Sequence, residues 1–338
     1  MAPTTVYYTD NGGRGWATVE LQAVLMARLF EADLVRLDAS RGYSKVELLP
    51  GLLPRRRRSG FALVIAPAPA HLNAVLSRHA LLTAHDYVAG WVVDSFWTDR
   101  IPRIARHRGA FDHLFVTDGE LVDHWATSTG SPTTWLPFGS DVLDHGSADP
   151  DRPVDVQRFG RMPPTWEDEA TVALRAAAHG IRYAGRTPFS ADPVANQRSL
   201  LRAAGRAAFT VAFSNAAAPA DYTHPTHEYL TGRWTDSLAA GAVVAGIPPT
   251  CQATRELLWD GALLELEGID LESGLAAIKA ARDSWTPVRA RHNHALALQR
   301  LDWRRRAQVI SQVSGVTTPT LVAELSRLEA AIATSSVP

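Results

Sequence analysis

The segment from Phe209 to Pro248 carries the residues whose types and spacing best suit chemistry. A buried-type strand at 209–213 leads through a loop rich in proline and alanine to the run HEYLTGR at 227–233, and then to a short helix of small residues. The start of a helix and an arginine can together hold a diphosphate, which points to Arg233. Asp236, in the first turn, could accept two ribose hydroxyls or could merely complement the helix dipole.

A second candidate site lies near the N-terminus, where the run GGRG at 12–15 separates a short strand from a helix. Glycines let the backbone approach a ligand, and the helix start favours an anion. The dinucleotide fingerprint is incomplete, because Thr18 stands where the third glycine belongs, but Asp38 ends the next strand as a ribose-binding acid would. The loop is therefore either a tight turn without a ligand or the nicotinamide site of an oxidoreductase that uses Gly13, Gly15 and Asp38.

Other polar residues allow fewer conclusions. Asp94 ends a buried strand, where it could act as a general base or cap the following segment. His227 and Glu228 lack the second histidine of the H-E-x-x-H zinc motif, since Thr231 occupies that position, so we expect no metal. The four arginines at 55–58 predict a solvated loop or a contact with an anionic partner.

Strands alternate with helices in two successive runs. We expect strands at 6–9, 34–37, 61–66, 87–93, 113–117, 133–137, 154–159, 181–184, 209–213 and 242–245. We expect helices at 17–30, 71–82, 100–108, 119–127, 166–178, 196–206, 232–240, 271–282, 288–313 with a break, and 321–333. This order predicts an α/β protein with two Rossmann-like parallel sheets, which bind ligands at the carboxyl ends of their strands.

A polar, proline-containing stretch at 146–153 is the best linker candidate. We therefore expect an N-terminal domain at 1–148, a C-terminal domain at 149–315, and a final helix at 316–338 that packs back on the N-terminal domain. With two such domains, the natural ligand site is the cleft between them.

Composition excludes several classes of protein. The 338 residues carry a net charge of −1, which argues against a nucleic-acid coat, and the one cysteine, Cys251, excludes an internal disulfide framework. The apolar stretches are too short to span a bilayer, and residues 1–8 do not read as a leader. We expect a cytoplasmic bacterial protein, and a homo-oligomer is compatible with the sequence.

Residues 228–241 resemble a known family. Seven residues separate Glu228 from Asp236, and Gly241 follows five positions later. This pattern is similar to the Glu-(seven residues)-Glu signature of retaining glycosyltransferases of the GT-B fold, although Asp236 replaces the second glutamate and Val243 a proline. The run LTGR at 230–233 also resembles the spore-maturation branch of these enzymes.

Four further segments resemble the family in the same order along the chain. They are NGG at 11–13 (the N-terminal glycine loop), WLPFGSD at 135–141 (the end of the first domain), FGR at 159–161 (the start of the second) and LDWR at 301–304 (the terminal helix region).

The chain also departs from the family. Trp166 stands where these enzymes place a phosphate-binding lysine, so Arg233 or Arg186 would have to supply that charge. Segments 209–215 and 229–241 resemble the inverting fucosyltransferases as well, which share the GT-B fold. Retention of the sugar's configuration is favoured, and inversion is the alternative.

The resemblance implies a hexosyltransferase that moves a sugar from a nucleoside diphosphate to a small natural product, a glycan or a peptide, without a metal or other cofactor. It implies a catalytic role for Glu228, which would face the donor sugar; Asp94, at the end of its strand, is the second catalytic candidate. Donor contacts would come from Arg161, Arg186, Tyr229, Thr231, Gly232, Arg233 and Asp236, and acceptor contacts from Asn11, Gly12 and Gly13. A GT-B-shaped binding protein without turnover is a further alternative.

Overall fold

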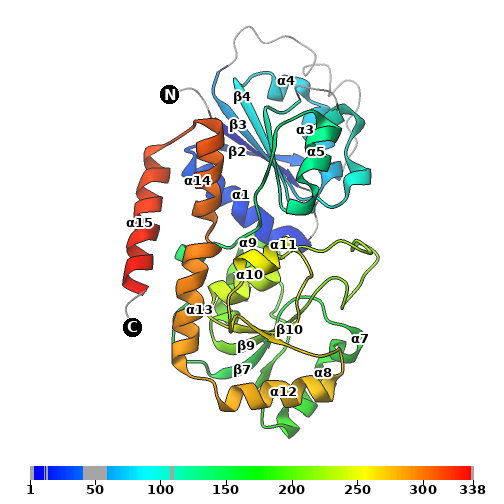
Figure 1. The fold of residues 1–338 in the computed structure, drawn as a ribbon, viewed down its shortest axis with the longest axis vertical. Helices are drawn as coiled ribbons and strands as arrows, with labels where there is room; N and C mark the ends of the chain where they lie inside the picture. Colours follow the sequence, from blue (N-terminus) through cyan, green and yellow to red (C-terminus); the bar gives the residue numbers. More distant parts are fainter. Residues whose placement is uncertain (1–3, 11, 13, 41–58, 107–109, 336–338) are drawn as a thin grey trace. The chain divides into compact units, whose positions relative to one another are not determined.

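The computed structural model describes residues 4–10, 12, 14–40, 59–106 and 110–335 (Figure 1). The chain divides into two compact units, each built from two parts of the sequence. The first unit contains the chain up to Pro137 together with Arg306–Ser326. The second contains Phe138–Arg305 together with the chain from Arg327 onward.

The first unit is built on a parallel sheet with the strand order β2-β1-β3-β4-β5-β6. Its strands are β1 (Thr4–Asp10), β2 (Asp33–Asp38), β3 (Phe61–Ala66), β4 (Tyr87–Val92), β5 (His113–Val116) and β6 (Thr133–Trp135). Its α-helices include α1 (Ala17–Leu29), α3 (Asn73–Leu76), α4 (His79–Leu82) and α5 (Val122–Thr129). The central strand β3 is apolar throughout because both faces of the sheet are covered.

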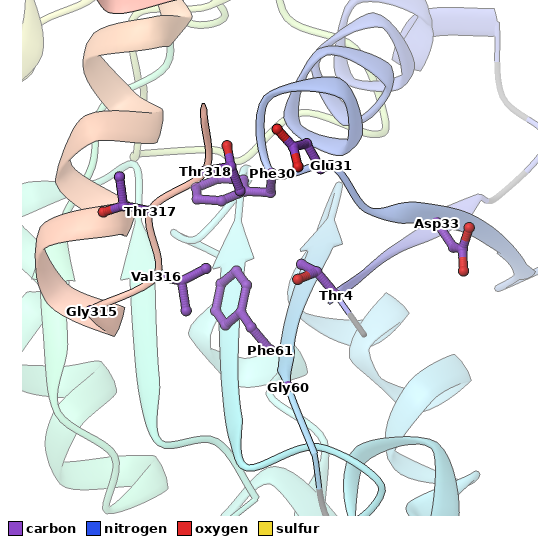
Figure 2. A pocket seen from close by; sticks show the side chains of 10 residues that line it. All are labelled: Thr4, Phe30, Glu31, Asp33, Gly60, Phe61, Gly315, Val316, Thr317 and Thr318. Carbon is purple, nitrogen blue, oxygen red and sulfur yellow. The ribbon is translucent and has the colours of Figure 1, made fainter. Parts of the chain in front are cut away.

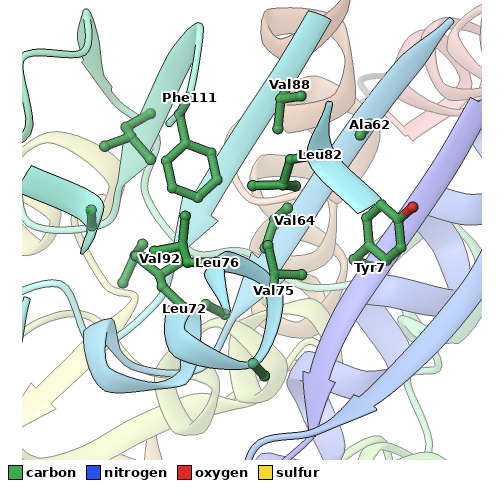
Figure 3. Packing of buried hydrophobic residues seen from close by; sticks show 14 of the residues in the cluster. Tyr7, Ala62, Val64, Leu72, Val75, Leu76, Leu82, Val88, Val92 and Phe111 are labelled. Carbon is green, nitrogen blue, oxygen red and sulfur yellow. The ribbon is translucent and has the colours of Figure 1, made fainter. Parts of the chain in front are cut away.

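One core of this unit lies between the sheet and the helices α3 and α5. Val64 and Val92 project from the strands toward Leu72, Leu76 and Phe111 (Figure 3). All five side chains are buried, so this layer holds the carboxyl ends of β3 and β4 in place.

The C-terminal part of the first unit contacts the end of α1. The Thr318 hydroxyl donates to the Leu29 carbonyl, and the Thr320 N–H donates to Glu31 over 3.1 Å. This segment joins α14 (Trp303–Ser314) to α15 (Pro319–Ser335).

The second unit is built on another parallel sheet, with the order β11-β10-β9-β7-β8. Its strands are β7 (Val154–Arg158), β8 (Tyr183–Ala184), β9 (Ala207–Phe213), β10 (Val243–Ile247) and β11 (Leu263–Glu265). Its helices are α6 (Val142–His145), α7 (Pro164–Glu167), α8 (Glu169–Ala178), α9 (Pro193–Ala204), α10 (Gly232–Ala239), α11 (Gln252–Leu257), α12 (Leu271–Asp283) and α13 (Pro287–Arg300).

Buried Arg152 ties several segments of the second unit together. Its guanidinium donates to the carbonyls of Gly205 over 2.6 Å and Ala240 over 2.9 Å, and its Nε donates to Asp149. Burial lowers the pKa of Arg152 to about 10.

The structure confirms the predicted pair of parallel α/β sheets, and it corrects some of the elements. The helix expected at 71–82 is broken after Leu76, where the Ser77 hydroxyl donates to the Asn73 carbonyl over 2.6 Å. The helix expected at 100–108 is only a 3-10 turn at Arg103–Arg106 within the described residues. Sequence reasoning missed α6, α11 and β11, which are too short to show a periodic pattern. Within the described ranges, every helix is too short or too polar to cross a bilayer.

Candidate anion-binding site

Polar side chains gather at the carboxyl edge of the second sheet. Arg161 follows β7, Asn215 follows β9, and Arg233 lies in the first turn of α10. The strands β7 and β9 are paired in parallel, so the residues that follow them meet at one edge.

Two arginines share one amide oxygen there. Arg161 Nη2 donates to Asn215 Oδ1 over 2.9 Å, and Arg233 Nη2 donates to the same oxygen over 2.6 Å. Arg161 Nε also donates to the Ala218 carbonyl, and Arg233 Nη1 donates to the Phe213 carbonyl over 2.7 Å. Both guanidinium groups are thus held in fixed positions by neutral acceptors.

Neither of these cations forms an ion pair within the described part of the chain. Among the described residues, no carboxylate lies within 4.0 Å of either guanidinium. Burial, and then the like charge of Arg161, lowers the pKa of Arg233 to about 10. A bound anion would relieve both effects, because it would pair directly with the guanidinium groups, which none of the described carboxylates does.

The local backbone makes room for this arrangement. Gly160 adopts a left-handed conformation (φ +83°), and a Cβ added there would lie only 2.5 Å from Arg233 Cδ. Thr231, just before α10, uses its hydroxyl to accept from Arg233 Nε over 3.3 Å. The first N–H groups of α10, which begins at Gly232, add their partial positive charge to the same region.

Glu228 lies beside this site and organises two loops. Its Oε1 accepts from the Ala216 N–H over 2.7 Å, and its Oε2 accepts from the Thr250 N–H over 3.3 Å. These donors follow β9 and β10, so the carboxylate joins the two loops. The structure therefore gives Glu228 a positioning role, in addition to any contact with a sugar.

Asp236 does not face this site. Its side chain is only 2% exposed, and its two oxygens accept from Ser140 Oγ over 2.6 Å and from Gln197 Nε2 over 2.5 Å. Burial raises the pKa of Asp236 to about 7. In this structure Asp236 therefore has a buried structural role, and the expected ribose contact stays a prediction.

Arg186 is engaged elsewhere at the same edge. It follows β8, is exposed, and forms ion pairs with Glu167 over 3.1 Å and Glu169 over 3.9 Å. The charge of Arg186 is therefore already compensated by carboxylates, whereas Arg161 and Arg233 donate to neutral acceptors. Tyr229, another expected donor contact, is partly buried.

The remaining expected residues belong to the first unit. Asp94 follows β4 and is partly buried, and its N–H donates to the Pro67 carbonyl over 2.8 Å. The left-handed Gly12 (φ +71°) donates its N–H to Asp10 over 2.8 Å, while Asn11 and Gly13 lie outside the described residues.

The features of the alternative nicotinamide site also lie in the first unit. Asp38 Oδ1 accepts from both the N–H and the hydroxyl of Ser40, which closes a local turn. Gly15 is exposed, in the 3-10 turn before α1.

Histidines near Glu228 do not assemble a metal site. The rings of His224 and His227 lie 4.8 Å apart, but His224 Nδ1 accepts from the His227 backbone N–H. Over the described parts of the chain, no three His, Cys, Asp or Glu side chains group as metal ligands.

A separate hollow of about 420 Å³ lies in the first unit, at the amino ends of β1, β2 and β3. Phe30 and Phe61 line it together with residues 315–318 (Figure 2). It lies at the opposite end of the strands from the edge where parallel sheets bind ligands.

Sequence reasoning did not predict that Asn215 and Gly160 contact the arginine pair. Asn215 could have been found from its position directly after a buried strand, which is where polar side chains reach the carboxyl edge. The contact between Gly160 and Arg233 forms only when two segments far apart in the sequence come together, so no local sequence pattern predicts it.

Comparisons with protein families and with curated protein sequences find no match for this chain. Similar solved structures include the pneumococcal O-GlcNAc transferase GtfA in complex with UDP and GlcNAc, with 12% identity and a TM-score of 0.44 over 75% of this chain and 56% of that one. S. aureus TarM, solved with Fondaparinux, alpha-GlcNAc-glycerol and UDP, has 9% identity and a TM-score of 0.40 over 79% of this chain and 55% of that one.

AviGT4, a glycosyltransferase involved in Avilamycin A biosynthesis, has 12% identity and a TM-score of 0.44. The match covers 92% of this chain and 97% of that one. The match to GtfA and TarM, in contrast, spans little more than half of those chains.

Proposed function

We propose that this protein is a GT-B glycosyltransferase that takes its sugar from a nucleoside diphosphate. The observation that carries the proposal is the pair Arg161 and Arg233, which converge on Asn215 with no carboxylate within 4.0 Å among the described residues. A diphosphate supplies the missing negative charge, and guanidinium groups bind phosphate oxygens in bidentate fashion.

The same arrangement suits the chemistry of sugar transfer. When the bond between the sugar and the diphosphate breaks, negative charge grows on the leaving oxygen. Fixed cations and N–H groups aimed at that oxygen stabilise the transition state, and removing one such donor costs about 2.7–4 kcal/mol of activation free energy. The resemblance of residues 228–241 to the family signature supports the same reaction.

The decisive experiment measures binding and turnover separately. Calorimetry with UDP, GDP, dTDP and inorganic pyrophosphate should show binding to the wild type, and Arg233→Ala should weaken it by at least tenfold while the protein stays folded. Arg186→Ala is the matched control, because Arg186 lies at the same edge but already pairs with Glu167.

Equal binding in the wild type and in Arg233→Ala would refute the anion site. Nucleotide binding without transfer from any sugar of a donor panel would instead support the non-catalytic alternative.

Two finer features belong to this proposal. The arginines would carry the charge that a divalent ion carries in other enzymes, so EDTA should leave transfer unchanged. The resemblance favours retention, and the anomeric coupling of the first product, read by proton NMR before it equilibrates, distinguishes retention from inversion.

The acceptor would bind at the carboxyl edge of the first sheet, near Gly12 and Asp94. Asp94→Asn should then raise the KM for the acceptor or lower kcat, and it should leave the affinity for UDP, GDP or dTDP unchanged. A lower nucleotide affinity in this variant would contradict the assignment.

A further inference from the structure

Two exposed aromatic side chains distinguish the carboxyl edge of the second sheet. Phe189, 59% exposed, follows β8, and Tyr222, 72% exposed, lies between β9 and α10. The other large apolar side chains exposed in the described residues are aliphatic and scattered: Leu174, Ile269, Val288 and Val322. Exposing an aromatic ring forgoes the free energy of burying it, so a ring presented at a candidate ligand edge suggests a partner.

Of these two side chains, Tyr222 is the one that contacts the arginine pair. The Cζ atom of Arg161 lies 5.1 Å from the centroid of the Tyr222 ring, within the range of a cation–π contact. Arg161 is in turn fixed by Asn215 and Ala218. The ring is therefore next to the proposed diphosphate, although most of its surface is open to solvent.

The loop backbone supports this placement. The Thr223 N–H donates to the Ala220 carbonyl over 2.9 Å, and the Thr223 hydroxyl donates to the same carbonyl over 2.8 Å. This closed turn presents Tyr222 at its tip, which lowers the entropy lost when the ring contacts a ligand.

We propose that Tyr222 stacks on the nucleobase of the donor. This inference rests on the proposed function and names the residue that recognises the flat part of the ligand. A nucleoside diphosphate presents an anion and an aromatic ring that are joined through a single ribose. Arg161 binds the first and Tyr222 the second, so one ligand can contact both side chains. Stacking tolerates every base, so the contact adds affinity and leaves base choice to other groups.

The test compares nucleotides with pyrophosphate, which lacks a base. Calorimetry uses UDP, GDP, dTDP and pyrophosphate with the wild type, Tyr222→Ala, Tyr222→Phe and Phe189→Ala. Tyr222→Ala should weaken the tightest nucleotide by about 5- to 100-fold, the range that aromatic stacking on a base supplies. Its pyrophosphate affinity should stay within about twofold of the wild type, and Tyr222→Phe and Phe189→Ala should bind the nucleotide normally.

Three results would overturn the inference. One is a nucleotide affinity unchanged in Tyr222→Ala, another is a loss in Phe189→Ala instead, and the third is an equal loss for pyrophosphate, which would mean that Tyr222 acts only through Arg161. Failure of the proposed function looks different, because the wild type would then either bind neither pyrophosphate nor nucleotide, or bind nucleotide without transferring a sugar from any donor.

Discussion

The buried carboxyl of Asp236 makes the stability of this protein depend on pH in an unusual direction. Desolvation raises its pKa from 3.8 to about 7 in the folded chain, despite the donors Ser140 and Gln197. Between these two values the folded state holds a proton that the unfolded state has lost. Stability therefore falls as pH rises through this window, and the total change is about 4 kcal/mol at 1.36 kcal/mol per pKa unit.

Asp236→Asn isolates this contribution, because the amide keeps the shape and does not titrate. Urea unfolding of both proteins at several values from about pH 5 to pH 7 gives their difference in free energy of unfolding. We expect the wild type to lose about 2 kcal/mol relative to the variant over that range, because the folded carboxyl is still half protonated at pH 7. Asp221→Asn, at an exposed position, controls for the loss of one negative charge. A difference that stays flat, or that grows in favour of the wild type as pH rises, would refute the reasoning.

Three further substitutions test other parts of the structure. Gly160→Ala should weaken pyrophosphate binding about tenfold in calorimetry, because the added Cβ would lie 2.5 Å from Arg233 Cδ and displace that side chain. Unchanged binding would show that Arg233 can bind the anion from another position. Gly246→Ala should lower the free energy of unfolding by more than about 3 kcal/mol in urea, because its Cβ would lie 1.7 Å from a carbonyl oxygen of β9. Arg152→Met should cost about 3 kcal/mol in the same assay, since several buried carbonyls lose their donor; a near-normal midpoint would mean that water replaces it.

The sequence predicted the sheets well because their strands are short apolar runs between turns. Phe61–Ala66 matches its predicted bounds, and the predicted break in the long C-terminal helix falls between α13 and α14. Buried parallel strands carry this signal locally, so no knowledge of their partners is needed.

The candidate site was only partly predictable. Arg233 was expected to bind the diphosphate from its position at a helix start, and Arg161 from the resemblance of residues 159–161 to the family. Asn215, which holds both, was not expected, because its role depends on segments far apart in the chain.

The environment of Asp236 could not be predicted from the sequence either. Local sequence places it near a helix start, but Ser140 and Gln197, which lie 96 and 39 residues away, determine its environment.

The discontinuous first unit has a consequence for synthesis on the ribosome. Its sheet strands all lie before Pro137, yet Arg306–Ser326 belongs to the same unit and binds the end of α1 through Thr318 and Thr320. A nascent chain must therefore make the whole second sheet before its first unit can close. During that interval the end of α1 lacks its contacts with Thr318 and Thr320, so a chaperone would act on the first unit mainly at this stage.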